Sequence, residues 1–233
     1  MKKLLAVSLA LAALAAPALA QDDAAYSVNT IGVIKYTVPP RGQMTFVSLP
    51  LNPPPDNTTN TWGRTSIAAQ LQPGSKVYFW DEGNQAWTPY TKSAAGRWNA
   101  AASNRLMTAG EGFFLQSPTT ASVEYVVSYI GELNEDDSAE FTVAGGSALS
   151  ARCSTMYPVT NAFGKYSVAT NVTPGSKVYF WDIANQQWTP YTRSATGRWN
   201  AAASNRVVNI GTGLFIQDTG DARVFVDPSP ISK

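Results

Sequence analysis

Short apolar runs separated by turn-forming residues recur along most of this chain. Residues 77–80 (VYFW) are followed by residues 81–85 (DEGNQ) and then by residues 86–91 (AWTPYT). Two strand-like runs around a segment rich in turn formers predict a β-hairpin. Pro89 has no N–H for a ladder hydrogen bond, so we expect its strand at a sheet edge or at a bulge.

Other segments also favour β structure. Residues 112–116 (GFFLQ) predict a buried strand. Alternation is clearest in four residues that would share one face of a strand: Val123, Tyr125, Val127 and Tyr129. Helical signals are short, namely residues 66–71 and a turn at residues 99–103 that Asn99 caps. No long segment has the 3.6-residue apolar spacing of an amphipathic helix.

The hairpin belongs to a block that occurs twice. Residues 73–116 and 174–217 align at an offset of 101 without gaps, and 32 of the 44 positions are identical. The second copy repeats the hairpin around Asp182 and Asn185. A repeat of this kind predicts two homologous structural units. We therefore expect an all-β fold with two tandem homologous small antiparallel β-sandwich or barrel domains and short helical turns, at residues 21–129 and 130–233.

The flanks of the block resemble each other only weakly. Three pairs of segments correspond loosely: residues 43–51 with 151–159, residues 31–38 with 130–143, and residues 126–130 with 223–227. Strand-like segments thus precede, separate and follow the two blocks. The pattern leaves two alternatives, a strand shared between neighbouring domains or a spare strand near the N-terminus.

The first twenty residues have the features of a signal peptide. Lys2 and Lys3 precede an apolar run, and residues 18–20 (ALA) form a small-residue cleavage pattern, so we expect cleavage before Gln21. No later segment approaches eighteen uninterrupted apolar residues, and we expect no membrane insertion after cleavage. The predicted location is the extracellular space or cell surface, with the periplasm as the alternative.

Charge argues against nucleic acid as a partner. Without Lys2 and Lys3 the chain has 15 basic and 16 acidic residues, a net charge of −1, whereas a nucleic-acid-binding domain shows a basic excess. Charged residues make up 14% and aromatic residues 11% of the chain, which suits a β-rich globular protein. No motif for a cofactor is present.

The chain has little of the chemistry that catalysis needs. It contains no histidine, which removes the usual base of serine and cysteine hydrolases and the commonest transition-metal ligand. Asp81 and Glu111 are the only paired carboxylates in motif-like surroundings, and the second copy has Thr212 where the first has Glu111. We therefore predict a protein that is not an enzyme.

Two further features have structural alternatives. Asp81 and Asn84 in the hairpin loop suit either a calcium ion or a turn held by side-chain hydrogen bonds, and we favour the turn and predict no metal site. Cys153, the single cysteine, is interpreted as a packed thiol rather than as an intermolecular disulfide or a nucleophile.

Aromatic residues are concentrated in the repeat, which holds six of the seven tryptophans. Flat rings beside Arg97 or Arg198 would suit a carbohydrate-binding surface. Aromatic side chains are equally what a short half-buried strand needs. Residues 77–80 are apolar on both faces, so one face must be covered by a loop, the other unit or another molecule.

One segment is identical in both copies. Residues 96–105 (GRWNAAASNR) equal residues 197–206, although a core alone would not fix its Asn, Ser and Arg. The segment is either a loop with its own hydrogen-bond network or a surface presented twice, and recombination between copies would also give this identity. The candidate ligand or interface residues are Trp87, Arg97, Trp98, Asn99, Arg105, Trp188, Arg198, Trp199, Asn200 and Arg206.

The block and its flanks resemble a pattern of uncharacterised secreted tandem β-repeat proteins from planctomycete and verrucomicrobial bacteria. The matching segments are residues 37–39 (TVP), 46–51 (FVSLPL), 73–77 (PGSKV), 80–81 (WD), 90–91 (YT), 110–114 (GEGFF) and 129–132 (YIGE). The resemblance implies units of about a hundred residues and no particular activity. The second copy departs from it at residues 211–214 (GTGL).

These observations favour a non-catalytic secreted structural or adhesive protein of the cell surface, a matrix or a head-to-tail filament. In its specific form, residues 26–38 complete the sheet of a neighbouring copy by strand addition. The alternative is a secreted carbohydrate-binding protein with two equivalent aromatic sites, for which glycans would be the partners.

Overall fold

The computed structural model describes residues 30–53 and 60–230. This part of the chain is mostly β structure, arranged in several antiparallel sheets, none of which closes into a barrel. Among its helices, none is long and apolar enough to cross a membrane. The predicted signal peptide and the cleavage site before Gln21 lie outside the described residues.

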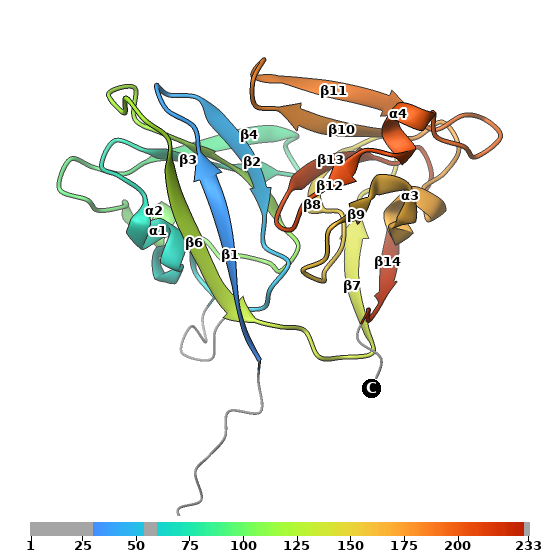
Figure 1. Cartoon of the computed structure of the whole chain (residues 1–233), viewed down its shortest axis with the longest axis horizontal. Coiled ribbons are helices and arrows are strands. Elements are labelled where there is room, and N and C mark those ends of the chain that lie inside the picture. The colour runs from blue at the N-terminus through green and yellow to red at the C-terminus, as the bar shows by residue number, and fades with distance from the viewer. Residues whose placement is uncertain (1–29, 54–59, 231–233) are drawn as a thin grey trace, which may run out of the picture.

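Each repeat combines a four-stranded sheet with a two-stranded ribbon (Figure 1). In the first repeat the sheet order is β2-β5-β3-β4 and the ribbon pairs β1 with β6. These strands are β1 (Ile31–Val38), β2 (Met44–Ser48), β3 (Lys76–Asp81), β4 (Ala86–Thr91), β5 (Gly112–Gln116) and β6 (Tyr125–Glu132). The helices are η1 (Trp62–Arg64), α1 (Ser66–Gln70) and α2 (Ala100–Ser103).

The second repeat has the same plan. Its sheet order is β11-β10-β13-β8, its ribbon pairs β7 with β14, and a small extra sheet pairs β12 with β9. The strands are β7 (Ser138–Val143), β8 (Leu149–Cys153), β9 (Asn161–Ala162), β10 (Lys177–Asp182), β11 (Gln187–Thr192), β12 (Val207–Val208), β13 (Gly213–Gln217) and β14 (Arg223–Pro228). The helices are η2 (Phe163–Lys165), α3 (Ser167–Asn171) and α4 (Ala201–Ser204).

The local predictions within the repeated block are confirmed. β3 and β4 form the hairpin, Pro89 lies on the edge strand β4, and β5 is a buried strand. Asn99 caps α2, because its side-chain oxygen accepts a hydrogen bond from the Ala102 N–H at 2.8 Å. Val123 is an exception, since it precedes β6 and is exposed.

The register of the sheets corrects the alignment of the flanks. Met44 is opposite Gln116 in the first repeat, and Leu149 is opposite Gln217 in the second. Gln116 and Gln217 are equivalent, so Met44 corresponds to Leu149 at an offset of 105. The loose match of residues 43–51 with 151–159 is therefore wrong by three residues. The short flanking strands share too few side-chain types for the sequence to fix their register.

The N-terminal strand is not spare. All eight residues of β1 pair with β6 of the same chain, and its inward side chains Ile34, Tyr36 and Val38 lie in the core. The prediction that this strand is donated to a neighbouring copy is wrong for residues 31–38, because the strand completes its own repeat. Residues 26–29 of that prediction lie outside the described part. The predicted domain boundary at 129/130 falls inside β6.

Three apolar cores hold the fold together. One core lies within the first repeat and a second lies within the second repeat. The third lies between the two four-stranded sheets, with Phe46, Phe114, Ala151 and Phe215 buried at its centre. β3 supplies two cores, because Phe79 faces the first core and Trp80 the third. The other repeat is thus what covers the second apolar face of the hairpin.

Candidate functional site

The predicted aromatic site residues are structural. Trp87 and Trp188 pack in the core between the repeats, with ring centroids 5.9 Å and 5.0 Å from that of Phe46. Trp98 donates from Nε1 to the Ala68 carbonyl at 3.0 Å, and Trp199 donates to the Ala169 carbonyl at 2.7 Å. These two half-buried rings thus hold α1 and α3 in place, and Trp199 together with Arg198 also lines a shallow surface pocket.

The polar residues of the identical segment also serve the fold. Asn99 and Asn200 cap α2 and α4 in the same way, with 2.8 Å hydrogen bonds. The guanidinium groups of Arg105 and Arg206 lie over the rings of Phe79 and Phe180, 4.8 and 4.6 Å from the centroids. These contacts support the interpretation of the segment as a demanding loop.

Arg97 and Arg198 are the exception within that segment. Both are exposed, and their hydrogen bonds to Ser93 and Ser194 involve their backbone N–H and C=O groups only. The structure gives no reason for the identity of their side chains.

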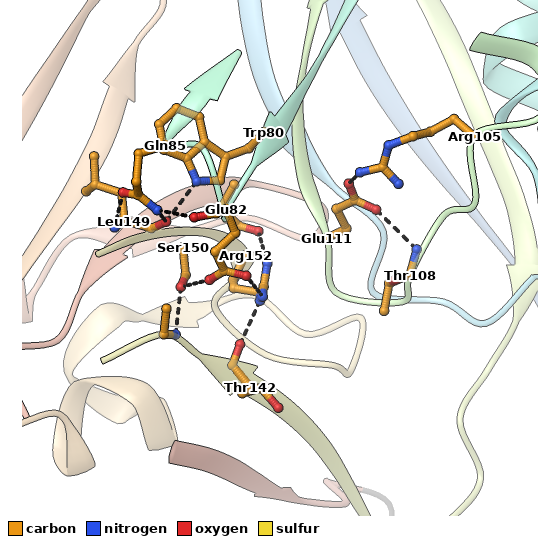
Figure 2. Close-up of polar contacts among 12 residues, drawn as sticks. Trp80, Glu82, Gln85, Arg105, Thr108, Glu111, Thr142, Leu149, Ser150 and Arg152 are labelled. Carbon is orange, nitrogen blue, oxygen red and sulfur yellow. Dashed lines mark hydrogen bonds and ion pairs between the residues drawn. The ribbon is translucent and has the colours of Figure 1, made fainter. Parts of the chain in front are cut away.

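Reciprocal contacts clamp the two repeats together. Gln85 accepts from the Leu149 N–H at 2.7 Å and donates to the Leu149 carbonyl at 3.2 Å (Figure 2). Gln186 makes the same two contacts with Met44, at 2.7 and 3.0 Å. A tryptophan hydrogen bond accompanies each clamp, from Trp80 to Leu149 and from Trp181 to Met44. The repeats therefore meet with approximate two-fold symmetry.

This symmetry creates two equivalent clefts of very different size. Each lies between the aromatic hairpin of one repeat and the ribbon of the other. The polar cleft, between the first hairpin and β7, has a volume of about 690 Å³. The apolar cleft, between the second hairpin and β1, has a volume of about 200 Å³.

A bonded network crosses the polar cleft (Figure 2). Glu82, just after β3, accepts from Arg152 Nη2 at 2.8 Å and from the Ser150 hydroxyl. Arg152 also donates from Nε to the Thr142 carbonyl on β7 at 2.8 Å. One arginine thus ties the first hairpin to the ribbon of the second repeat.

A second ion pair lies deeper in the polar cleft. Glu111 is 7% exposed, pairs with Arg105, and accepts from the Thr108 N–H at 3.2 Å. Burial raises the pKa of Glu111, and the nearby Arg105 offsets part of this effect. The Arg105 guanidinium therefore lies between Glu111 Oε1, to which it donates a hydrogen bond, and the ring of Phe79.

The apolar cleft lacks three of these four charges, since only Arg105 has a charged counterpart, Arg206. Ile183 stands at the position of Glu82, Val47 at that of Arg152, and Thr212 at that of Glu111. Ile210 replaces Ala109 and narrows the space. The two clefts share a frame, but only the first has ionisable groups facing each other across it.

The glutamate side chains of the polar cleft are engaged by neighbouring groups of the protein. Both oxygens of Glu82 and both oxygens of Glu111 already accept hydrogen bonds from the protein. Each carboxylate also has an arginine partner, Arg152 for Glu82 and Arg105 for Glu111. Neither is placed as a free acid or base, although the cleft does bring Asp81 and Glu111 together as the sequence suggested.

Asp81 behaves as a turn residue. Its Oδ1 accepts from the Asn84 N–H at 2.9 Å and its Oδ2 from the Asn84 side chain at 2.8 Å. These hydrogen bonds lower the pKa of Asp81. Asp182 and Asn185 repeat the arrangement. The predicted hydrogen-bonded turn is therefore confirmed, and no cluster of three Cys, Asp or Glu side chains suited to a metal occurs in the described parts of the chain.

Cys153 is a packed thiol. It is 2% exposed, its Sγ lies 3.6 Å from Met156 Sδ, and burial raises its pKa to about 12. A thiol this inaccessible and this weakly ionised suits neither a nucleophile nor an intermolecular disulfide. The interpretation as a packed residue is supported.

The two ribbons differ at their open edges. The Leu133 N–H donates to the Thr30 carbonyl, so these two residues form a hydrogen-bonded pair of the ladder. Hydrogen-bonded and non-hydrogen-bonded pairs alternate along an antiparallel ladder, so the N–H and C=O groups of Val33 and Lys35 point away from β6. Within residues 30–53 and 60–230 these groups have no partner. The matching edge of β7 is blocked by Arg152 at Thr142. Arg152 thus closes one edge, and Val47 leaves the equivalent edge open.

The outer face of the first ribbon is also the more apolar. Val33 and Ile130 face each other across the strands, 58% and 42% exposed. Ile31 and Val126 lie on the same face, 48% and 55% exposed. On the second ribbon the outward residues include Glu140 and Thr142 beside Val224 and Val226. The outer face of the first ribbon therefore exposes more apolar residues than that of the second.

Comparisons of this chain with protein-family models, curated proteins and solved structures found no match. Of the residues that distinguish the two clefts, Glu111 and Thr212 were singled out from the sequence, whereas Glu82, Arg152 and Glu140 were not. A signal was present nonetheless: Glu82 with Ile183, and Glu111 with Thr212, are non-conservative differences inside an otherwise near-identical block.

Proposed function

We propose that this chain is a non-catalytic exported structural or adhesive protein that associates with further copies of itself. In this proposal the two homologous β-sandwich-like units act as one body and belong with the secreted tandem-repeat proteins that the sequence resembles. The observation that carries it is the unpaired edge and apolar outer face of the first ribbon. A monomer rarely leaves both an open strand edge and its apolar face exposed.

The proposed partner strand is β1 of a second copy. The outward edge of β14 is not available for pairing, because α3 packs beside it, with hydrogen bonds from Ser167 to Asp227 and from Arg223 to the Asn171 carbonyl. Pairing the outward peptide groups of Val33 and Lys35 with those of a second β1 would join two ribbons into one sheet. Such a contact is self-complementary, and it would bring the exposed apolar residues of both ribbons together.

A substitution in β1 tests this proposal. Val33→Pro removes an outward N–H and spares the hydrogen bonds to β6, whereas Val33→Thr keeps that donor at the same position. We expect the mature protein and Val33→Thr to form dimers whose proportion rises with concentration, and Val33→Pro to stay monomeric, as measured by light scattering and negative-stain microscopy. A monomeric wild type, or assembly of Val33→Pro equal to that of the wild type, would refute the proposal.

The alternative of two equivalent aromatic glycan sites finds less support. Its rings, Trp87, Trp98, Trp188 and Trp199, are engaged in the cores or in hydrogen bonds to helix carbonyls. Trp98→Ala is therefore expected to lower the melting temperature by several degrees. An unchanged melting temperature would instead favour a role of this ring in glycan binding.

A further inference from the structure

We infer that the polar cleft is a single binding site for a neutral oligosaccharide, built jointly by the two repeats. Its location differs from the two aromatic surfaces considered above. The inference adds a ligand to the proposed adhesive role and is independent of self-association, since calorimetry reports binding and light scattering reports assembly.

The first argument is the space. At about 690 Å³ the polar cleft is of the size of known small-molecule sites, while its equivalent is about 200 Å³. The first hairpin supplies one wall and β7 with Arg152 the other. The ion pair of Arg152 with Glu82 fixes the distance between these walls. A rigid, preformed groove suits a ligand that is itself semi-rigid.

The second argument is the charge of the lining. Four carboxylates and two guanidinium groups line the cleft, a formal excess of two negative charges. Both guanidinium groups are already committed to glutamates, so no free cation remains to take an anionic ligand. An acidic sugar or a phosphate would be repelled.

The third argument is the set of groups that remain available. Glu140 on β7 is exposed, and its carboxylate has no partner within the described residues. Thr88 and Tyr90 also line the cleft, and their hydroxyl groups have no hydrogen-bond partner among the described residues. A free carboxylate and two free hydroxyl groups match a ligand with many hydroxyl groups.

An extended peptide is the competing ligand, because β7 is a strand edge. Arg152 already occupies the Thr142 carbonyl, so strand addition would first have to break a bond to a charged group. The edge is blocked where it borders the cleft. The observations thus favour a ligand recognised through side chains.

The pseudo-symmetry supplies matched controls. Ala109→Ile introduces the residue that the apolar cleft already has at this position, Ile210, and so should fill the space without unfolding the protein. Glu140→Gln removes one charge and Tyr90→Phe one hydroxyl group that would contact the ligand. Their controls are Lys35→Gln and Tyr191→Phe, at the equivalent positions of the apolar cleft.

The test is isothermal titration calorimetry of the mature protein with cello-, malto-, xylo- and mannohexaose, with spermidine and a lysine-rich hexapeptide as cationic probes. We expect at least one hexasaccharide to bind, a loss of binding of at least tenfold with Ala109→Ile, and losses of about fivefold with Glu140→Gln and Tyr90→Phe. Lys35→Gln and Tyr191→Phe should bind like the wild type, and melting temperatures confirm that all variants fold. Binding of the cationic probes alone, no binding of any hexasaccharide, or binding that survives Ala109→Ile would overturn the inference.

Discussion

The two sides of this molecule are built on the same frame and present opposite surfaces. On one side, the ion pair of Arg152 with Glu82 bridges a wide cleft, and Arg152 blocks the edge of β7. On the other, Ile183 and Val47 stand in equivalent places, the cleft is narrow, and the edge of β1 is open. The comparison shows that the two copies of a duplicated fold can keep the same arrangement of strands while their surface residues diverge. The positions at which the repeats differ are the informative ones.

A substitution in the core between the repeats should destabilise both repeats. Phe46 is 4% exposed and contacts Trp188, Phe114 and Phe215 in the core between the repeats. We expect Phe46→Ala to lower the free energy of unfolding by about 3–5 kcal/mol, because it leaves a cavity among aromatic rings. Urea denaturation monitored by tryptophan fluorescence measures this loss. A loss below about 1 kcal/mol would mean that the repeats do not depend on this core.

Making the polar side resemble the apolar one should have a smaller effect on stability and a larger effect on association. Arg152→Val introduces the residue of the first repeat and leaves Glu82 and the Thr142 carbonyl without this partner. The expected cost is about 1–3 kcal/mol, since hydrogen bonds to a charged group are lost. The free edge of β7 should also increase the assembly seen by light scattering, and unchanged assembly would show that Arg152 does not block that edge.

Substitutions of the two helix caps should cost the same on both sides. Asn99→Ala and Asn200→Ala each remove one side-chain hydrogen bond at the start of α2 and α4. We expect a loss of about 1 kcal/mol for each, measured by urea denaturation. A clear difference between the two variants would indicate that the identical segments have different roles.

The smallest expected effect is a pH dependence of the stability that comes from Glu111 in the polar cleft. Burial raises the pKa of Glu111 in the folded protein, so between its ordinary pKa and the raised value the folded state binds more protons than the unfolded state. Wild-type stability relative to Glu111→Gln should therefore fall as the pH rises through this window from about 4.5, by less than about 1.4 kcal/mol per pH unit. Thr212→Ala, at the equivalent position, serves as the control with no such dependence. Parallel curves for the wild type and Glu111→Gln would contradict the assignment.

The sequence predicted local structure well where the chemistry of a turn or cap was local. The hairpin, the buried strand β5 and the cap at Asn99 depend on neighbouring residues and could be read from them. The long-range arrangement depended on contacts that no local pattern encodes. β1 pairs with β6 about a hundred residues away, and the second face of β3 is covered by the other repeat.

The candidate site was harder to predict for a similar reason. Sequence identity between the copies drew attention to Trp98, Asn99 and Arg105, which maintain the loop. The cleft is formed by residues far apart in the chain, such as Glu82 and Arg152, which meet only because the sheets pack face to face. No spacing rule joins them, and only their divergence from Ile183 and Val47 marked them.

The glutamine clamps have a consequence for how the two halves stay together. Gln85 reaches from the first repeat to Leu149, and Gln186 returns the contact to Met44, which is the self-complementary form of contact found in a symmetric dimer. Here both partners are parts of one polypeptide, joined by the short connection between β6 and β7. A contact that would weaken on dilution in a dimer has become intramolecular, with an effective concentration set by that linker. Dilution of the protein therefore does not separate the halves, and each cleft keeps both of its walls.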